Sequence, residues 1–291
     1  MKKTLVALAV AASAIVSGSS VAALGGWTES QPNGPINIGG TVTLPPNDMK
    51  WLWAVGEGMN NYKHTIRELS NGNTALTISV ADDTPFLAAK MNKAVALPIL
   101  GIIPKVEFKS YDQSVAAMDF QSEKNATLTV KVRDVNDALI GNLVIPLTFG
   151  AGATNVDTVN EINEPQAEFA AMLVPSGNGG IFEGIVKPGT QTNPSLGLKW
   201  SGVTTTEIKD KMLAAFQDLH LVSGLQNVFV GTGFMNYSEL SHGNYTSTSD
   251  IRYAVYGAGI PAGSSLSLKF NKAIKEETEW KAPVTVNVTY Q

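Results

Sequence analysis

Residues 280–291 close the chain with the sequence WKAPVTVNVTYQ. Apolar side chains occupy every second position, which is the period of a β-strand with one buried face. No other stretch of the sequence alternates so strictly over this length, and the pattern predicts a strand that runs almost to the last residue. Its apolar face consists of Trp280, Ala282, Val284, Val286, Val288 and Tyr290.

A second alternating stretch, GPINIGGTVTL at residues 34–44, lies near the other end of the chain. It too has the period of a half-buried strand. Prolines at positions 32, 35, 45 and 46 separate it from its neighbours, because proline cannot take part in a central sheet ladder. Its predicted inward face holds Ile36, Ile38, Gly40, Val42 and Leu44.

These two strands are complementary if they belong to different molecules. An uncovered strand edge promotes aggregation, so natural proteins cover it, and no chain follows residue 291 in this sequence to cover the C-terminal strand. Addition of a strand from a second subunit would do so. The alternative is that residues 280–291 form the ordinary last strand of a sandwich.

The first residues have the layout of a secretory signal peptide. Lys2 and Lys3 precede an apolar run at residues 5–16, and small residues follow it. We expect cleavage after Ala23, or alternatively after Ala22. Because the apolar run is shorter than the ~20 residues that span a bilayer, we expect an exported protein without a membrane anchor.

Composition limits the possible partners and sources of stability. The 291-residue chain has no cysteine, and its formal net charge of −4 becomes −6 when Lys2 and Lys3 leave with the signal. Scattered charges of this kind provide no electrostatic footprint for nucleic acid. Without disulfides, an exported domain depends on packing or on a partner chain for its stability.

Most of the chain consists of evenly spaced alternating segments separated by Gly, Pro and Asn, which predicts a β-sandwich. Residues 151–249 differ, because residues 164–173 have helical character and residues 204–221 predict an amphipathic helix. We interpret this region as an insertion, with a continuation of the same sheet as the alternative. The predicted helix has a capping box formed by Thr204 and Glu207 and a stripe of Ile208, Met212, Leu213, Phe216 and Leu219.

The sequence shows no credible catalytic or metal-binding motif. Its histidines, His64, His220 and His242, lack a metal-binding spacing, and a chain without cysteine has no thiolate ligands. A GxSxG nucleophile motif is also missing. We therefore expect neither enzymatic activity nor a cofactor.

Six segments make the chain resemble the FaeG-type major fimbrial subunits of enterotoxigenic bacteria, which the chaperone–usher pathway assembles. Within that family the resemblance is to the F-forty-one-like branch. It covers most of the mature chain and is looser from residue 151 to residue 235. The segments are WTESQPNGPINIGGTVT (27–43), KWLWAVGEGMN (50–60), PFLAAKM (85–91), SHGNYTS (241–247), YGAGIPAGSSL (256–266) and EWKAPVTVNVTY (279–290).

The resemblance implies an incomplete immunoglobulin-like sandwich that a donor strand completes. A periplasmic chaperone would first supply that strand, and the N-terminal arm of the next identical subunit would replace it at an outer-membrane usher. The implied parts are a signal at 1–23, a donor-strand extension at 24–46, a core at 47–150 and 250–291, and an inserted subdomain at 151–249. The pairing strand would present Val284, Val286, Val288 and Tyr290 to the donor residues Ile36, Ile38, Gly40, Val42 and Leu44.

The resemblance also implies that the inserted subdomain binds host glycoconjugates. Phe182 aligns with a sugar-contacting ring in the family's Ile-Phe-x-Gly segment, although Phe182 and Trp200 could instead be core residues. The functional hypothesis is a polymerising, adhesive subunit of a cell-surface fimbrium. A purely structural pilin with a separate adhesin and a secreted glycan-active enzyme are the alternatives. The candidate sugar-binding residues are Phe182, Glu183, Trp200, Asn236, Tyr237, Asn244 and Tyr245.

Overall fold

The computed structural model describes residues 51–96, 103–157, 166–176, 181–218, 225–236 and 251–290. The predicted signal peptide and the donor-strand segment lie outside these residues. The strands are β1 (Trp51–Val55), β2 (Ala75–Ser79), β3 (Thr84–Met91), β4 (Val95–Ala96), β5 (Pro104–Lys109), β6 (Ala117–Phe120), β7 (Asn125–Arg133), β8 (Leu139–Asp157), β9 (Gln166–Leu173), β10 (Val228–Asn236), β11 (Ile251–Arg252), β12 (Ala254–Ile260), β13 (Ser265–Phe270) and β14 (Thr285–Tyr290). The helices are α1 (Pro194–Ser201) and α2 (Thr205–Asp218), with a short 3₁₀ turn at Ile66–Glu68.

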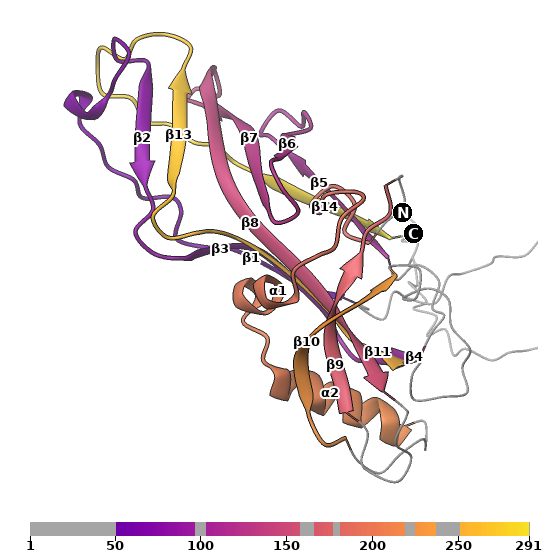
Figure 1. Ribbon diagram of the computed structural model, residues 1–291. Coiled ribbons are helices and arrows are strands. Elements are labelled where there is room, and N and C mark those ends of the chain that lie inside the picture. The colour runs from indigo at the N-terminus through magenta and orange to yellow at the C-terminus, as the bar shows by residue number, and fades with distance from the viewer. Residues whose placement is uncertain are drawn as a thin grey trace, which may run out of the picture. The chain divides into compact units, whose positions relative to one another are not determined.

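The fold is mainly β, as the alternating pattern predicted. The largest sheet has the strand order β1-β3-β12-β8-β13-β2, and β7 and β9 also pair with β8. β6 extends the sheet from β7, and β10 extends it from β9. Figure 1 shows the long strand β8 running from the end that holds β2 and β13 to the end that holds β9, β10 and α2. This arrangement of open sheets is consistent with a β-sandwich.

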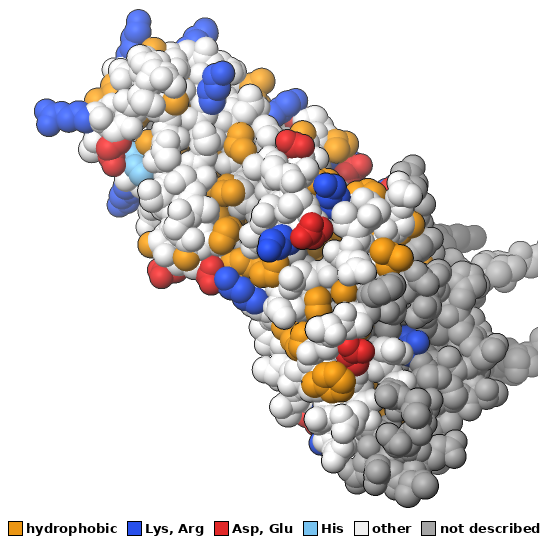
Figure 2. Space-filling view, in the orientation of Figure 1, with side chains coloured by type: hydrophobic (Ala, Val, Ile, Leu, Met, Phe, Trp, Pro, Cys, Tyr) orange, Lys and Arg blue, Asp and Glu red, His pale blue; other side chains and the backbone are white. Residues whose placement is uncertain are grey.

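Two shorter sheets accompany the large one. β14 pairs antiparallel with β5, and β11 pairs antiparallel with β4. Alternation along β5 and β7 buries every second side chain, so these strands contribute one face each to the core. Figure 2 shows charged side chains of both signs interspersed with apolar ones over the visible face of the molecule.

The described part of residues 151–249 continues the large sheet. β8 passes through residue 151 without a break, β9 pairs antiparallel with its last residues, and β10 pairs parallel with β9. The helical character expected for residues 164–173 is wrong, because most of this segment forms β9. Four consecutive residues of β9, from Phe169 to Met172, are all buried, and a strand segment buried on both faces loses the alternation that identifies strands.

The helix predicted at residues 204–221 is present as α2, and its buried residues include Ile208, Met212 and Phe216. The predicted capping box forms only in part. Thr204 Oγ1 accepts a hydrogen bond from the backbone N–H of Glu207 at 3.1 Å. The carboxylate of Glu207 pairs with Lys90 Nζ on β3 at 2.6 Å, which joins the helix to the large sheet.

Candidate functional site

Among the strands that the structure describes, β14 pairs with one neighbour only, β5. It pairs with β5 so that Val286 lies opposite Phe108 and Val288 lies opposite Val106. Among the residues that the structure describes, no strand pairs with the other edge of β14. Backbone N–H and C=O groups on such an edge are available to a further strand.

The apolar face of β14 is covered less completely than that of β5. Val106 and Phe108 are 2% and 3% exposed, whereas Val286 and Val288 directly opposite them are only half-buried. Opposite partners in an antiparallel pair point to the same side of the sheet. Other residues therefore cover the apolar side chains of β5 fully, but they cover those of β14 only in part. We call the half-buried side chains Val284, Val286, Val288 and Tyr290 the β14 face.

Two contacts between aromatic side chains join the segment 280–290 to β1 and to Tyr62, which follows β1. Trp53 Nε1 donates a hydrogen bond to Tyr290 Oη at 2.9 Å. The ring of Tyr62 stacks on that of Trp280, with centroids 6.5 Å apart and planes 6° from parallel. β1 itself pairs only with β3 among the described strands. These contacts hold the chain at Trp280, before β14 begins, and at Tyr290, the last residue of β14.

The Phe182 segment, which sequence similarity suggested as a sugar contact, lies in the core. Phe182 is 0% exposed. Its ring centroid is 5.2 Å from that of Trp51, 6.4 Å from that of Trp53 and 4.8 Å from that of Tyr256. A ring enclosed in this way has no face free for a pyranose in this structure. It instead supports Trp53, which holds the end of β14.

Glu183 and Gly184 attach the same segment to β5. The N–H of Val106 donates to the carbonyl of Glu183 at 2.8 Å, and Lys105 Nζ lies 2.7 Å from Glu183 Oε1. Gly184 has a φ of +95°, and a Cβ there would lie 2.0 Å from the carbonyl oxygen of Val106. Only glycine combines that dihedral angle with such close backbone contact. The Ile-Phe-x-Gly pattern therefore has a structural explanation in this chain.

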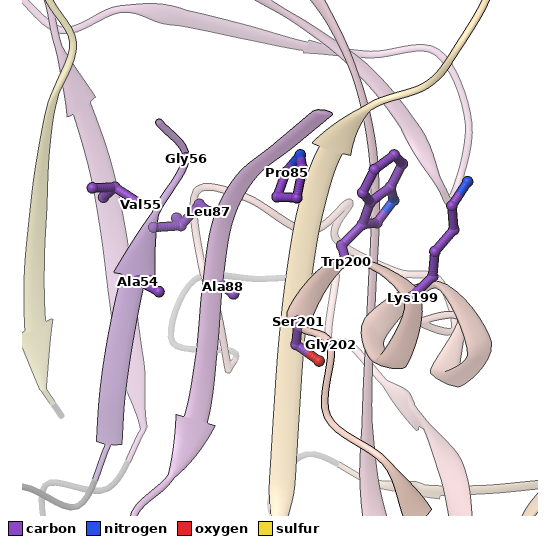
Figure 3. A pocket seen from close by; sticks show the side chains of 10 residues that line it. All are labelled: Ala54, Val55, Gly56, Pro85, Leu87, Ala88, Lys199, Trp200, Ser201 and Gly202. Carbon is purple, nitrogen blue, oxygen red and sulfur yellow. The ribbon is translucent and has the colours of Figure 1, made fainter. Parts of the chain in front are cut away.

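Trp200 is also buried, between α1 and the large sheet. Its Nε1 donates to Thr148 Oγ1 at 2.9 Å, and Lys199 Nζ lies 4.4 Å from its ring centroid. Lys199 also pairs with Asp83 at 2.7 Å, and this hydrogen bond lowers the pKa of the Asp83 carboxyl group. Figure 3 shows Lys199 and Trp200 on α1 beside a shallow cavity of about 250 Å³ that Pro85 and Val55 also line. The indole lies beside this cavity with little surface exposed.

Several predicted site residues lie outside the described part of the chain. The donor residues Ile36, Ile38, Gly40, Val42 and Leu44 are among them, as are Tyr237, Asn244 and Tyr245. Asn236 ends β10, and only its backbone is described. Sequence reasoning missed the contribution of Trp53 and Tyr62 to the β14 edge. The alternation of KWLWAVG was visible, but it does not reveal which remote strand the tryptophans contact.

The part of the chain that the structure describes contains no helix that could span a membrane. In the same residues, no group of three or more His, Asp or Glu side chains could hold a metal ion.

Relatives of known type share the full length of this chain. Residues 1–291 match the family described as "Fimbrial, major and minor subunit". The chain belongs to this fimbrial subunit family. It is 40% identical to the F41 fimbrial protein of Escherichia coli over 296 residues, which is the whole of both chains. It is 30% identical to K88 fimbrial protein AB and 29% identical to K88 fimbrial protein AD of the same species, again over the whole of both chains.

Membership of this family establishes the general role of the protein. It is a structural subunit of the K88/F41 type, and subunits of this type polymerise into a surface fimbrium. Each subunit of such a fibre contacts another copy of the chain.

Proposed function

We propose that the subunits polymerise by donor-strand complementation at the β14 edge. The arm at residues 24–46 of one copy would add a strand beside β14 of the next. Ile36, Ile38, Val42 and Leu44 would cover the β14 face, and Gly40 would lie where a side chain does not fit. The observation that carries the proposal is the contrast between the buried β5 residues and the half-buried residues opposite them on β14.

The energy available from this step is sufficient to hold a fibre together. Burial of four aliphatic side chains contributes about 6–12 kcal/mol at ~1.5–3 kcal/mol each, before the cost of ordering the arm. The stability of a whole domain is ~5–15 kcal/mol. One added strand can therefore determine whether the subunit stays folded. The proposal includes export through the periplasm, where a chaperone would cover the β14 face until an outer-membrane usher exchanges it for the arm.

A pair of substitutions on β14 tests the acceptor side. Val288→Asp places a charge on the β14 face, whereas Thr289→Asp places the same charge on the exposed opposite side. We expect Val288→Asp to abolish fibres and Thr289→Asp to leave them intact, as seen by electron microscopy.

Deletion of residues 24–44 tests the donor side and should also abolish fibres. Normal fibre assembly without the arm would rule out the proposal.

We propose further that this subunit carries adhesion to host glycoconjugates through the region 151–249. Because Phe182 and Trp200 are buried and a sugar needs an exposed aromatic face, we expect other residues of that region to contact the sugar. The experiment is a glycan-binding assay on purified fibres made of this subunit alone. Sugar binding would support adhesion by the subunit itself. Fibres that assemble normally but bind no sugar would favour the alternative of a structural pilin with a separate adhesin.

A further inference from the structure

The β10 strand begins with residues that favour pairing with another strand. Val228, Phe229 and Val230 are β-branched or aromatic, and the last two are 43% and 40% exposed. Among the described strands, β10 pairs with β9 only. An exposed apolar strand at the edge of a sheet is a site where identical molecules pair and aggregate. The fold therefore needs some feature that opposes such pairing at β10.

The ladder between β10 and β9 is interrupted directly after Val230. Val230 pairs with Phe169, and Phe234 pairs with Ala171, so residues 231–233 lie opposite a single residue of β9. We call residues 231–233 the β10 bulge. A bulge bends its strand and increases the local twist. It thereby removes the straight edge that a second strand needs for continuous pairing.

The side chain of Glu168 on β9 holds the β10 bulge in place. Glu168 Oε1 accepts a hydrogen bond from the N–H of Gly233 at 2.8 Å. A Cβ on Gly231 would lie 1.7 Å from Glu168 Oε1, and a Cβ on Gly233 would lie 2.7 Å from Glu168 Oε2. The two glycines therefore leave a space that the carboxylate fills, and the carboxylate gives the bulge a hydrogen-bond partner within the same subunit.

A lysine covers the residues just before β10. Lys209 Nζ on α2 donates to the carbonyl oxygen of Gln226 at 2.8 Å. The next carbonyl oxygen, that of Asn227, accepts from the N–H of Ala167 at 3.1 Å. Both acceptors thus have partners within the subunit. Lysine at a strand edge also opposes pairing, because a second strand would have to remove water from its charge.

From this arrangement we propose that the β10 bulge, together with Glu168 and Lys209, prevents β10 from pairing with β10 of another fibre. The excluded partner is a second copy of this chain, because identical apolar strands pair readily at their edges. Every subunit of a fibre carries this edge, so even a weak contact would be multiplied between two adjacent fibres. The inference concerns contacts between fibres and does not depend on how subunits join within one fibre.

Deletion of Gly231 and Thr232 tests the proposal. The deletion leaves one residue of β10 opposite the one residue of β9 between Phe169 and Ala171, so it restores a regular ladder. Because side chains alternate with a period of two, the loss of two residues keeps the rest of β10 on its original side. We expect fibres of this variant to associate side by side, with several-fold higher turbidity than wild-type fibres and bundles in electron micrographs.

Two sets of control variants separate the bulge from other effects. Phe229→Lys in the deletion variant places a charge on the straightened strand and should return the turbidity to the wild-type value. Glu168→Ala and Glu168→Gln in the full chain both remove the negative charge, but only glutamine keeps an oxygen that accepts from Gly233. We expect Glu168→Ala to raise the turbidity and Glu168→Gln to leave it near that of wild type.

The outcomes decide the proposal as follows. Bundling of the deletion variant that Phe229→Lys reverses supports it. Separate fibres of the deletion variant with an unchanged melting temperature overturn it. Equal bundling by Glu168→Ala and Glu168→Gln also overturns it, since loss of charge would then explain the association. If the deletion variant does not assemble, the two Glu168 variants decide: bundling by Glu168→Ala alone supports the proposal, and separate fibres of both overturn it.

Discussion

Phe182 combines a positive φ of 54° with a completely buried ring. A bulky residue rarely adopts this backbone conformation, and the strain persists only where surrounding contacts enforce it. Here three aromatic neighbours and the hydrogen bond between Glu183 and Val106 do so. The residue therefore stabilises the core near the end of β14.

We expect Phe182→Ala to destabilise the folded subunit by about 3–5 kcal/mol, as large-to-small changes of a buried phenylalanine do. Phe229→Ala removes the same atoms from an exposed site and should cost less than about 1 kcal/mol. Thermal unfolding of purified fibres measures both changes. Equal stability of the two variants would contradict the core assignment of Phe182.

Asp112 provides a second prediction at the residue scale. A hydrogen bond from Lys131 and further bonds from Ser114 lower the pKa of its carboxyl group from 3.8 to about 2. A carboxyl group whose pKa is lower in the folded state stabilises the fold above its ordinary pKa. This contribution is lost as the pH falls through the window from about 4 to about 2.

Asp112→Asn should therefore lower the melting temperature of fibres between pH 5 and pH 7, where the carboxylate is charged. The difference from wild type should shrink as the pH falls from about 4 to about 2. Because the side chain is exposed, the effect should be small and reduced by salt. A difference that grows toward low pH would show that the sign is wrong.

At the scale of elements, α1 packs closely on the large sheet because the residues of β12 that face Trp200 are glycines, which have no Cβ. A Cβ on Gly259 of β12 would lie 2.1 Å from Cε3 of Trp200, and one on Gly257 would lie 2.7 Å from its Cβ. The helix itself begins at the N-cap Asn193, whose side chain accepts from the N–H of Leu196, and ends at Gly202 with a φ of +70°. Helix caps and strand glycines together fix where Trp200 lies.

Gly259→Ala should destabilise the subunit by about 1–3 kcal/mol, because overpacking forces the indole or the strand to move. In a Trp200→Ala background the added methyl group has room, so the same change should cost much less. Thermal unfolding of the four members of this double-mutant cycle measures the coupling. Additive effects would show that Gly259 and Trp200 do not interact.

At the scale of the whole molecule, the proposed donor arm and the β14 face are separate parts of one chain. A subunit without residues 24–44 cannot donate a strand but keeps its own β14 edge. Such a subunit should accept an arm and then terminate the fibre. Added to wild-type subunits during assembly, it should shorten fibres in proportion to its share, as measured by electron microscopy.

The control for this prediction combines the truncation with Val288→Asp. That variant can neither donate nor accept, so it should leave the length of wild-type fibres unchanged. Equal shortening by the two truncated forms would show that the β14 face is not the acceptor.

The sequence was sufficient for the features that depend on local pattern. Alternation predicted the strand at β14 and the β-rich fold, because a strand with one buried face repeats every two residues. The stripe of α2 was predicted in the same way. The segment that forms β9 was misread, because its residues 169–172 are buried on both faces of the sheet and show no such alternation.

The sequence by itself determined the type of most elements and the family of this protein, since both depend on residues in a fixed order along the chain. Only the tertiary structure decided which aromatic rings are enclosed and which are exposed. Phe182 is buried because Trp51, Trp53 and Tyr256, all distant in sequence, surround it. Phe229 is exposed because it lies on β10, beside the carboxylate of Glu168. Contacts between remote segments determine burial, and no local pattern encodes them.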